Sequence, residues 1–436
     1  MASVSLPDLP KGKEFEEYIS ACFQSVGYYI ERNIIERGTE EVLELDIITT
    51  SYYSCLPEIK LVEVKSGDWG FSDLFKVYGW MNYLNISQGL FVVNKEKEIT
   101  KMDFYKEKAK KLNIELIPIP DLNKSKEALS ELLNNSTIED LDISNWRFSY
   151  WVERNLLEKL NHKKKSNPDR KCFKSLDDYY FKVNSGIFFT ESIVQKVSEL
   201  YSAFQEFPLI SAKCGNELIG NTFDGEYEEL PKNIYENTYY NCTYNDIQIS
   251  TFIEHRARLA IIKNAIDYQL YKKSGIENKH KDIGGDEKML FDRLPSSFKQ
   301  GLEEISRNQY FHRYPIFWQW FMWIFGGFIL KDYKEEEYKN LSQKTGIPPE
   351  EIPNALESYQ ILFHRDDGWL IDLSPNSNII LMKMFPVPFM GIGANYRRDI
   401  YTESKKFEDL KLSGNHTFDD LVKWNNLTVK VLQNNR

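Results

Sequence analysis

The first 120 residues alternate between helical and extended apolar patterns, and this alternation restricts the possible folds more than any other feature of the sequence. Apolar residues in 11–28 share one helical face, and the pattern stops at Gly27. Three extended runs, a helical run, a strand, a second helical run and a final strand follow. These runs occupy 28–36, 41–51, 58–66, 71–85, 88–94, 102–113 and 114–120. The order αβββαβαβ predicts a mixed sheet that is flanked by helices.

The remaining residues predict further domains of a different character. At 436 residues, of which 42% are hydrophobic and 14% aromatic, the chain can form two or three packed cores. We expect an α/β domain at 1–123, followed by a polar linker with a short helix at 124–150. Amphipathic helices at 151–286 predict a mainly helical domain, and 287–436 predict a C-terminal domain.

Residues 333–386 have the pattern helix, turn, helix and hairpin, with the turn at 346–348 and the hairpin around 366–368. This order resembles a winged helix-turn-helix, a fold of many bacterial regulators. The second helix carries three glutamates and neither lysine nor arginine, so its electrostatic field opposes phosphate. The three are Glu350, Glu351 and Glu357. We therefore expect this winged-helix-like segment to pack or to contact protein.

Several features bear on the cellular compartment. The five cysteines are far apart, odd in number and without a CxxC pair, so the sequence predicts neither a disulfide framework nor a thiolate zinc site. The N-terminus has no basic region followed by an apolar one, and we expect a cytoplasmic protein. The apolar run Tyr314–Leu330 is shorter than the roughly 20 residues of a membrane span and contains Pro315 and Gln319. It predicts a buried core helix, without membrane association.

A glycine-containing segment near the C-terminus, MGIGANYRRD at 390–399, places two glycines before Arg397 and Arg398. Such a segment could hold an anionic ligand, but Gly-x-Gly alone specifies little. We therefore expect a tight turn with two solvated arginines.

A polar pair interrupts the third extended run, EIKLVEVKS. Glu63 and Lys65 are two positions apart in this run, so they point to the same face of the strand. Asp46 in the preceding run lies beside them if the two strands pair as neighbours. Two carboxylates near a lysine suit a hard divalent cation such as Mg²⁺ or Mn²⁺. Glu44 shares the face of Asp46 and could be the ligand in its place.

Asp46, the Glu63-Val64-Lys65 triplet and an αβββαβ core together resemble the PD-(D/E)XK nuclease superfamily, which has the restriction-endonuclease-like fold. The first helical run is similar to the first helix of Holliday-junction resolvases and of modification-dependent restriction enzymes. Its matching residues are Gly12, Phe15-Glu16 and Gly27-Tyr28. The resemblance covers about the first quarter of the chain.

The resemblance implies a role for each matching residue. Asp46, Glu63 and the Val64 carbonyl would hold the metal. Lys65 would orient the attacking water or stabilise the charge that develops on phosphorus, and Glu16 would support the metal shell through water. The chain departs from the superfamily pattern at one position. The superfamily is named for a proline before the aspartate, and this chain has a leucine there.

Two groups of basic residues are candidates for contact with nucleic acid. Lys76 lies on the helical run after the Glu-x-Lys strand and could contact phosphate. The densest basic patch lies in NHKKKSNPDRKCFK, which is otherwise a solvated lysine-rich loop. Its candidates are Lys163, Lys164, Lys165, Arg170 and Lys171. The net charge of −10 opposes capture of nucleic acid by the unaided chain.

The sequence therefore predicts a Mg²⁺-dependent endonuclease that hydrolyses DNA, in restriction or antiviral defence, with RNA as an open alternative substrate. The C-terminal domains would regulate it or assemble it, through a homo-oligomer or a partner protein. The alternative from another class is a non-catalytic regulator that binds nucleic acid with the nuclease-like fold and the winged helix.

Overall fold

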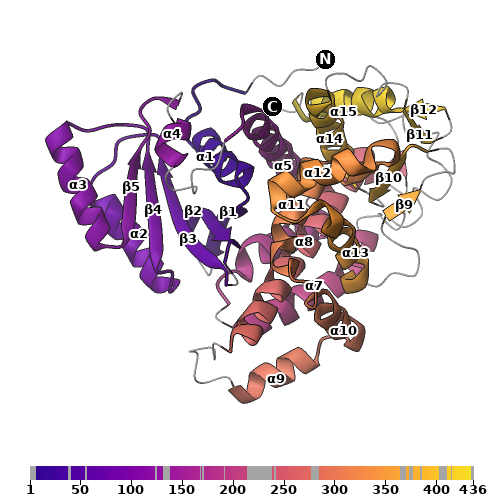
Figure 1. The fold of residues 1–436 in the computed structure, drawn as a ribbon, viewed down its shortest axis with the longest axis horizontal. Helices are drawn as coiled ribbons and strands as arrows, with labels where there is room; N and C mark the ends of the chain where they lie inside the picture. The colour runs from indigo at the N-terminus through magenta and orange to yellow at the C-terminus, as the bar shows by residue number, and fades with distance from the viewer. Residues whose placement is uncertain are drawn as a thin grey trace. The chain divides into compact units, whose positions relative to one another are not determined.

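A computed structural model of the chain divides into two compact units, Ser5–Arg147 and Phe148–Arg436 (Figure 1). We describe each unit by itself. The structure describes residues 6–433 except 38–40, 55, 123–124, 131–137, 167, 169–170, 191, 214–237, 240–241, 276–283, 364–369, 373–376, 383–384, 402–409 and 414. A further domain boundary at 286/287 stays a prediction.

The N-terminal unit is built on a five-stranded sheet with the strand order β1-β2-β3-β4-β5 (Figure 1). The strands are β1 (Tyr29–Arg37), β2 (Glu41–Ser51), β3 (Glu58–Lys65), β4 (Gln88–Val93) and β5 (Ile114–Pro118). The first three strands pair antiparallel, whereas β3, β4 and β5 run parallel to one another. The predicted mixed sheet is confirmed.

Helices cover both faces of this sheet. They are α1 (Lys13–Ser25), α2 (Phe71–Tyr83), α3 (Ile99–Lys111) and α4 (Ser125–Ser130). On one face, Arg32 of β1 lies 3.7 Å from Glu17 of α1. The strand register places Arg32 on β1 and Leu90 on β4 in one row of paired residues, so both side chains face α1. Gly89 precedes Leu90 and therefore lies on the opposite face of the sheet. On that face, a Cβ at Gly89 would lie 2.5 Å from the sulfur of Met81 in α2.

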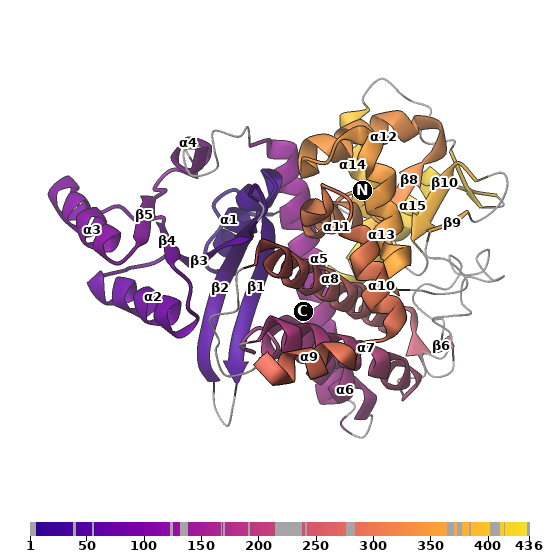
Figure 2. The ribbon, with the colours of Figure 1, turned by 60° about the horizontal axis from the view of Figure 1, so that its bottom comes forward.

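The C-terminal unit is mostly helical (Figure 2). Its helices are α5 (Asp140–Ser166, which begins in the N-terminal unit), α6 (Lys171–Phe181), α7 (Ile193–Lys213), α8 (Tyr244–Ser274), α9 (Gly284–Asp292), α10 (Ser296–Ile305), α11 (Tyr314–Trp323), α12 (Lys334–Thr345), α13 (Ile352–Phe363), α14 (Val387–Ile400) and α15 (Phe418–Gln433). Its short strands are β6 (Thr238–Tyr239), β7 (Cys242–Thr243), β8 (Phe328–Leu330), β9 (Leu370–Asp372), β10 (Ile379–Met382), β11 (Lys411–Ser413) and β12 (His416–Thr417).

The apolar run at 314–330 is buried, as predicted, but it forms two elements rather than one helix. Every residue of α11 is buried, and the helix ends at Trp323. Gly326 and Gly327 then turn the chain with φ of 68° each, and β8 follows. This left-handed conformation favours glycine, which has no Cβ to clash. No helix in the described part of the chain is both long and apolar enough to cross a membrane.

The winged-helix-like segment has the predicted pair of helices. The first, α12, ends at Gly346, which adopts φ 70° as a left-handed cap. Strands β9 and β10 pair antiparallel. The hairpin expected around 366–368 stays a prediction. Residues 366–368 precede β9 and lie outside the described residues.

The turn predicted at 390–399 is wrong, because these residues form most of α14. The two glycines allow close packing instead of a turn. A Cβ at Gly391 would lie 2.2 Å from the side chain of Asn425 in α15, and one at Gly393 would lie 2.4 Å from the Phe325 carbonyl oxygen. Helices α14 and α15 lie side by side (Figure 2). The segment therefore serves helix packing.

Arg397 is not solvated as predicted but is fully buried, with Glu337 of α12 as its partner. Its Nε lies 2.9 Å from both carboxylate oxygens, and its Nη2 lies 2.5 Å from Oε2. The remaining N–H groups donate to the carbonyl oxygens of Phe325, Gly393 and Phe328, at 2.8, 3.0 and 2.6 Å. The guanidinium therefore joins α12, α14 and the turn before β8.

We predict that Arg397→Gln lowers the free energy of unfolding by about 3–5 kcal/mol, because it leaves the Glu337 carboxylate buried without its charge partner. Urea unfolding followed by tryptophan fluorescence measures the loss. The matched control is Arg398→Gln, because Arg398 is partly exposed and lies 3.5 Å from Asp419. That variant should lose at most about 1 kcal/mol. Equal losses in the two variants would contradict the central role of Arg397.

Candidate active site

The candidate site lies where β2 and β3 separate, at the carboxyl end of β3. The ladder between the two strands ends with Ile47 opposite Val62. The next position on each strand is a carboxylate, Asp46 on β2 and Glu63 on β3. Asp46 Oδ2 accepts a hydrogen bond of 2.9 Å from the backbone N–H of Val64. The structure thus brings together the two carboxylates that the sequence paired.

Glu63 and Lys65 form an ion pair on β3. Lys65 Nζ lies 2.7 Å from Glu63 Oε1. The Glu63 residue is only 1% exposed, and its other oxygen, Oε2, is buried without a hydrogen-bond partner in the described part of the chain. A buried carboxylate oxygen without a partner is costly, so this atom is suited to a cation or a hydrogen-bond donor.

The carboxylates perturb one another electrostatically. Burial raises the pKa of Asp46 to about 8, and the nearby charges of Glu63 and Glu16 add to this rise. The Val64 N–H and the Lys65 ammonium oppose it. For Lys65, burial would lower the pKa, but the hydrogen bond and charge of Glu63 raise it above its ordinary value. The site therefore combines a positively charged lysine with a carboxyl pair that resists full ionisation.

Helix α1 begins beside the end of β3. The backbone N–H of Gly12 donates a hydrogen bond of 2.7 Å to Ser66 Oγ, directly after Lys65. Burial raises the pKa of Glu16, with Arg32 opposing the rise and Glu44 adding to it. The Glu16 charge is thus close enough to act on Asp46, and its support of a metal shell stays a prediction.

Glu44 differs from Asp46 in its environment. Glu44 is exposed, whereas Asp46 is partly buried and bonded to the backbone of β3. Asp46 directly follows the last pair of the β2–β3 ladder, Ile47 with Val62, whereas Glu44 lies two residues further from it. This geometry favours Asp46 as the partner of Glu63.

The residues fit a divalent cation held by two carboxylates. Within the described residues, no three His, Cys, Asp or Glu side chains gather into a complete ligand set. Mg²⁺ does not require such a set, because it keeps several waters and binds through one or two carboxylates. Asp46 and the unpaired Glu63 oxygen supply that number. The role of the Val64 carbonyl as a third ligand stays a prediction.

The sequence did not single out Asn33, which lies on β1 beside Asp46 of β2. The neighbours of Asn33 pair with the neighbours of Asp46, Arg32 with Ile47 and Ile34 with Leu45. Asn33 itself adopts φ 50°, a left-handed conformation that asparagine tolerates better than most residues. The signal in the sequence was a single asparagine inside an otherwise extended run. The sheet is therefore locally distorted next to the site.

The basic candidates have mixed environments. Lys76 is exposed on α2, and its Nζ lies 4.2 Å from the ring centroid of Trp80. The patch predicted as a loop lies mainly on helices, with 163–165 at the end of α5. Lys164 Nζ lies 2.5 Å from Asp177 Oδ2.

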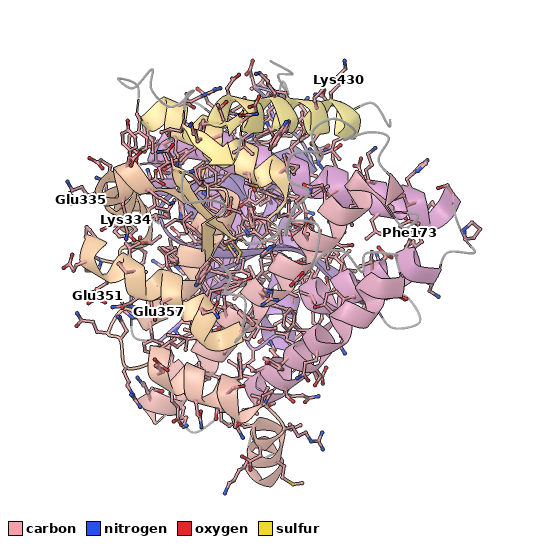
Figure 3. All side chains as sticks on the ribbon, turned by 90° about the vertical axis from the view of Figure 1, so that its right-hand side faces the viewer. Phe173, Lys334, Glu335, Glu351, Glu357 and Lys430 are labelled. Atoms are coloured by element: carbon pink, nitrogen blue, oxygen red, sulfur yellow. The ribbon has the colours of Figure 1, made fainter. Side chains whose placement is uncertain are left out.

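Lys163 Nζ lies 5.6 Å from the ring centroid of Phe173, which Figure 3 labels. Lys165 is exposed, while Arg170 and the side chain of Lys171 lie outside the described residues. Contact of this patch with nucleic acid stays a prediction.

Comparison with protein-family models, with curated proteins and with solved structures finds no significant match to this chain. The chemistry of the site therefore rests on its own geometry.

We predict that Asp46 makes a destabilising contribution to the metal-free protein that grows as pH rises from about 4 towards about 8. The ordinary pKa of an aspartate is 3.8, and that of Asp46 in the folded protein is about 8. Between these values the folded state holds a proton that the unfolded state releases, so the free energy of unfolding falls with rising pH.

Urea unfolding in EDTA at several pH values measures this slope. The Asp46→Asn variant should lose part of the slope, whereas the Glu44→Gln variant should keep it. An unchanged slope in Asp46→Asn would contradict the carboxylate pairing.

Proposed function

We propose that this chain is a metal-dependent endonuclease that hydrolyses DNA, and that its N-terminal unit is a PD-(D/E)XK nuclease domain. The observation that carries the proposal is the convergence of Asp46, Glu63 and Lys65 at one end of β3. An isolated Glu-x-Lys pair would be an ordinary surface ion pair. Here Glu63 is buried, a second carboxylate lies beside it, and one carboxylate oxygen has no partner in the described part of the chain.

Hydrolysis of a phosphodiester needs an activated water and a sink for the charge on the phosphoryl oxygens. A bound Mg²⁺ or Mn²⁺ would supply both. Asp46 and Glu63 would hold the cation, and the Val64 carbonyl would complete the protein ligands. Glu16 would accept hydrogen bonds from water in the outer shell.

Lys65 has two tasks in this proposal. Its raised pKa keeps the ammonium protonated, so it carries a full positive charge beside the carboxylates. The ion pair with Glu63 fixes Nζ at the site, where it would orient the attacking water or offset charge on the phosphate. Lysine acts here as a point charge, which suits a phosphate oxygen.

The C-terminal unit would regulate cleavage or assemble the enzyme. A net charge of −10 makes capture of DNA by a single chain weak and sensitive to salt. Glu357 projects from the surface of α13 (Figure 3), and Glu350 is also exposed. These charges disfavour DNA reading by the winged-helix-like segment. A homo-oligomer or a partner protein would therefore supply the additional positive surface that DNA binding needs. The biological role would be in defence, such as restriction.

We predict that Glu63→Ala, Lys65→Ala and Asp46→Asn each lower the rate of plasmid cleavage with Mg²⁺ by about a hundredfold or more. Each change removes a metal ligand or the positive charge at the site. A time course on supercoiled plasmid measures the rate, and circular dichroism verifies the fold. Glu44→Gln is the matched control and should cut like the parent. Full activity of Glu63→Ala or Lys65→Ala would refute the assignment.

We predict that the double change Glu350→Gln and Glu357→Gln leaves DNA affinity unchanged or raises it, because it removes two exposed negative charges from α13 and the turn before it. Glu351 stays intact, because its Oε2 accepts hydrogen bonds from Asn308 and Asn354 at 2.6 and 2.7 Å. Fluorescence anisotropy with labelled duplex DNA at several salt concentrations measures the affinity. A clear loss of affinity would mean that this helix contacts DNA.

A further inference from the structure

A pocket of about 780 Å³ lies in the N-terminal unit, at the opposite end of β3 from the carboxylates. It is formed where the parallel strands β3, β4 and β5 begin, and α3 contributes one wall. Lys60 on β3 lines the pocket, five residues before Lys65. At about 3.3 Å per residue, these two positions are roughly 17 Å apart along the strand. The pocket is therefore separate from the candidate active site.

Three lysines surround this pocket. Lys60 comes from β3, and Lys106 and Lys110 lie one turn apart on α3. Among the described residues, none forms an ion pair or a hydrogen bond with the ammonium group of any of the three. One carboxylate, Glu115, also lines the pocket, so the charge of the lining remains positive.

Other lysines of α3 have ion-pair partners among the described residues, unlike Lys106 and Lys110. Lys108 and Lys111 lie 3.5 and 2.9 Å from Glu107, and Lys101 lies 3.0 Å from Glu98. Lys106 and Lys110 are exposed, and like charges one helical turn apart repel each other weakly, so an anion between them would be favourable. The helix dipole favours lysine in the last turn of α3, but it does not account for Lys60 on a strand.

The rest of the lining suits a small molecule. Ser87, Gln88 and Asn113 supply hydroxyl and amide groups, while Leu90 and Leu116 supply apolar surface. The volume falls within the range of about 300–1,000 Å³ that is typical of ligand pockets. Three lysines and several polar groups in one lining match a compact ligand with several negative charges.

We propose that this pocket binds a small molecule with two or more linked phosphate groups, such as a nucleoside triphosphate. Lysine ammonium groups act as point charges for phosphate oxygens, and three of them offset a triphosphate better than a single phosphate. A small ligand is favoured over a nucleic-acid strand because the pocket is concave and limited in volume. The proposal does not depend on the nuclease activity.

Isothermal titration calorimetry of the full-length protein in EDTA tests the proposal, with ATP, inorganic triphosphate and adenosine as probes. ATP and inorganic triphosphate should bind, and adenosine should not. The Lys60→Gln, Lys106→Gln and Lys110→Gln variants should each bind about tenfold more weakly, the loss of one charge-assisted contact. Lys111→Gln is the matched control on the same helix and should bind like the parent.

Four outcomes would overturn the proposal. The first is that neither phosphate probe binds, and the second is that Lys111→Gln weakens binding as much as Lys110→Gln. The third is that Glu63→Gln abolishes binding, which would place ATP at the carboxylates. The fourth is that a DNA oligonucleotide binds and depends on the three lysines, while ATP does not. Retained binding in Glu63→Gln would support a separate pocket.

Discussion

The antiparallel register of β2 and β3 is the constraint on which the candidate site depends. It brings Asp46 and Glu63 to the end of the ladder, one residue beyond the pair of Ile47 and Val62, and the hydrogen bond from the Val64 N–H holds the Asp46 carboxylate against the neighbouring strand. The buried Glu63 and the partly buried Asp46 repel each other when both are ionised, so this arrangement carries an electrostatic cost that the surrounding sheet must offset. In the proposed function, a cation bound between them would relieve this cost, and metal binding would then be coupled to the stability of the strands.

Much of the N-terminal unit could be predicted from the sequence, because its signals are local. Period-two patterns marked the strands, and short connections made β2 and β3 neighbours. The same periodicity placed Glu63 and Lys65 on one face. The choice between Asp46 and Glu44 required coordinates, since both share that face and only burial and the contact with Val64 distinguish them. The left-handed φ of Asn33 could not be predicted either, because asparagine tolerates that conformation but does not require it.

The C-terminal unit was predicted less well, because contacts between distant residues determine its structure. Arg397 lies 60 residues from its partner Glu337, and no local pattern indicates that they pair in the interior. Glycines in MGIGANYRRD suggested a turn, but their small size serves the contact of α14 with α15. The burial of 314–330 was predictable from hydropathy alone, whereas the break after α11 depends on the conformation of two glycines.

Strand β3 carries functional candidates at both ends, and they point to opposite faces. Lys60 lies at an even position and Lys65 at an odd one, so the strand exposes one to each side of the sheet. Insertion or deletion of one residue within β3 would move every later side chain to the other face. During evolution, length variation should therefore be confined to the flanking loops, and the interval between Lys60 and Lys65 should stay fixed among descendants that keep both sites.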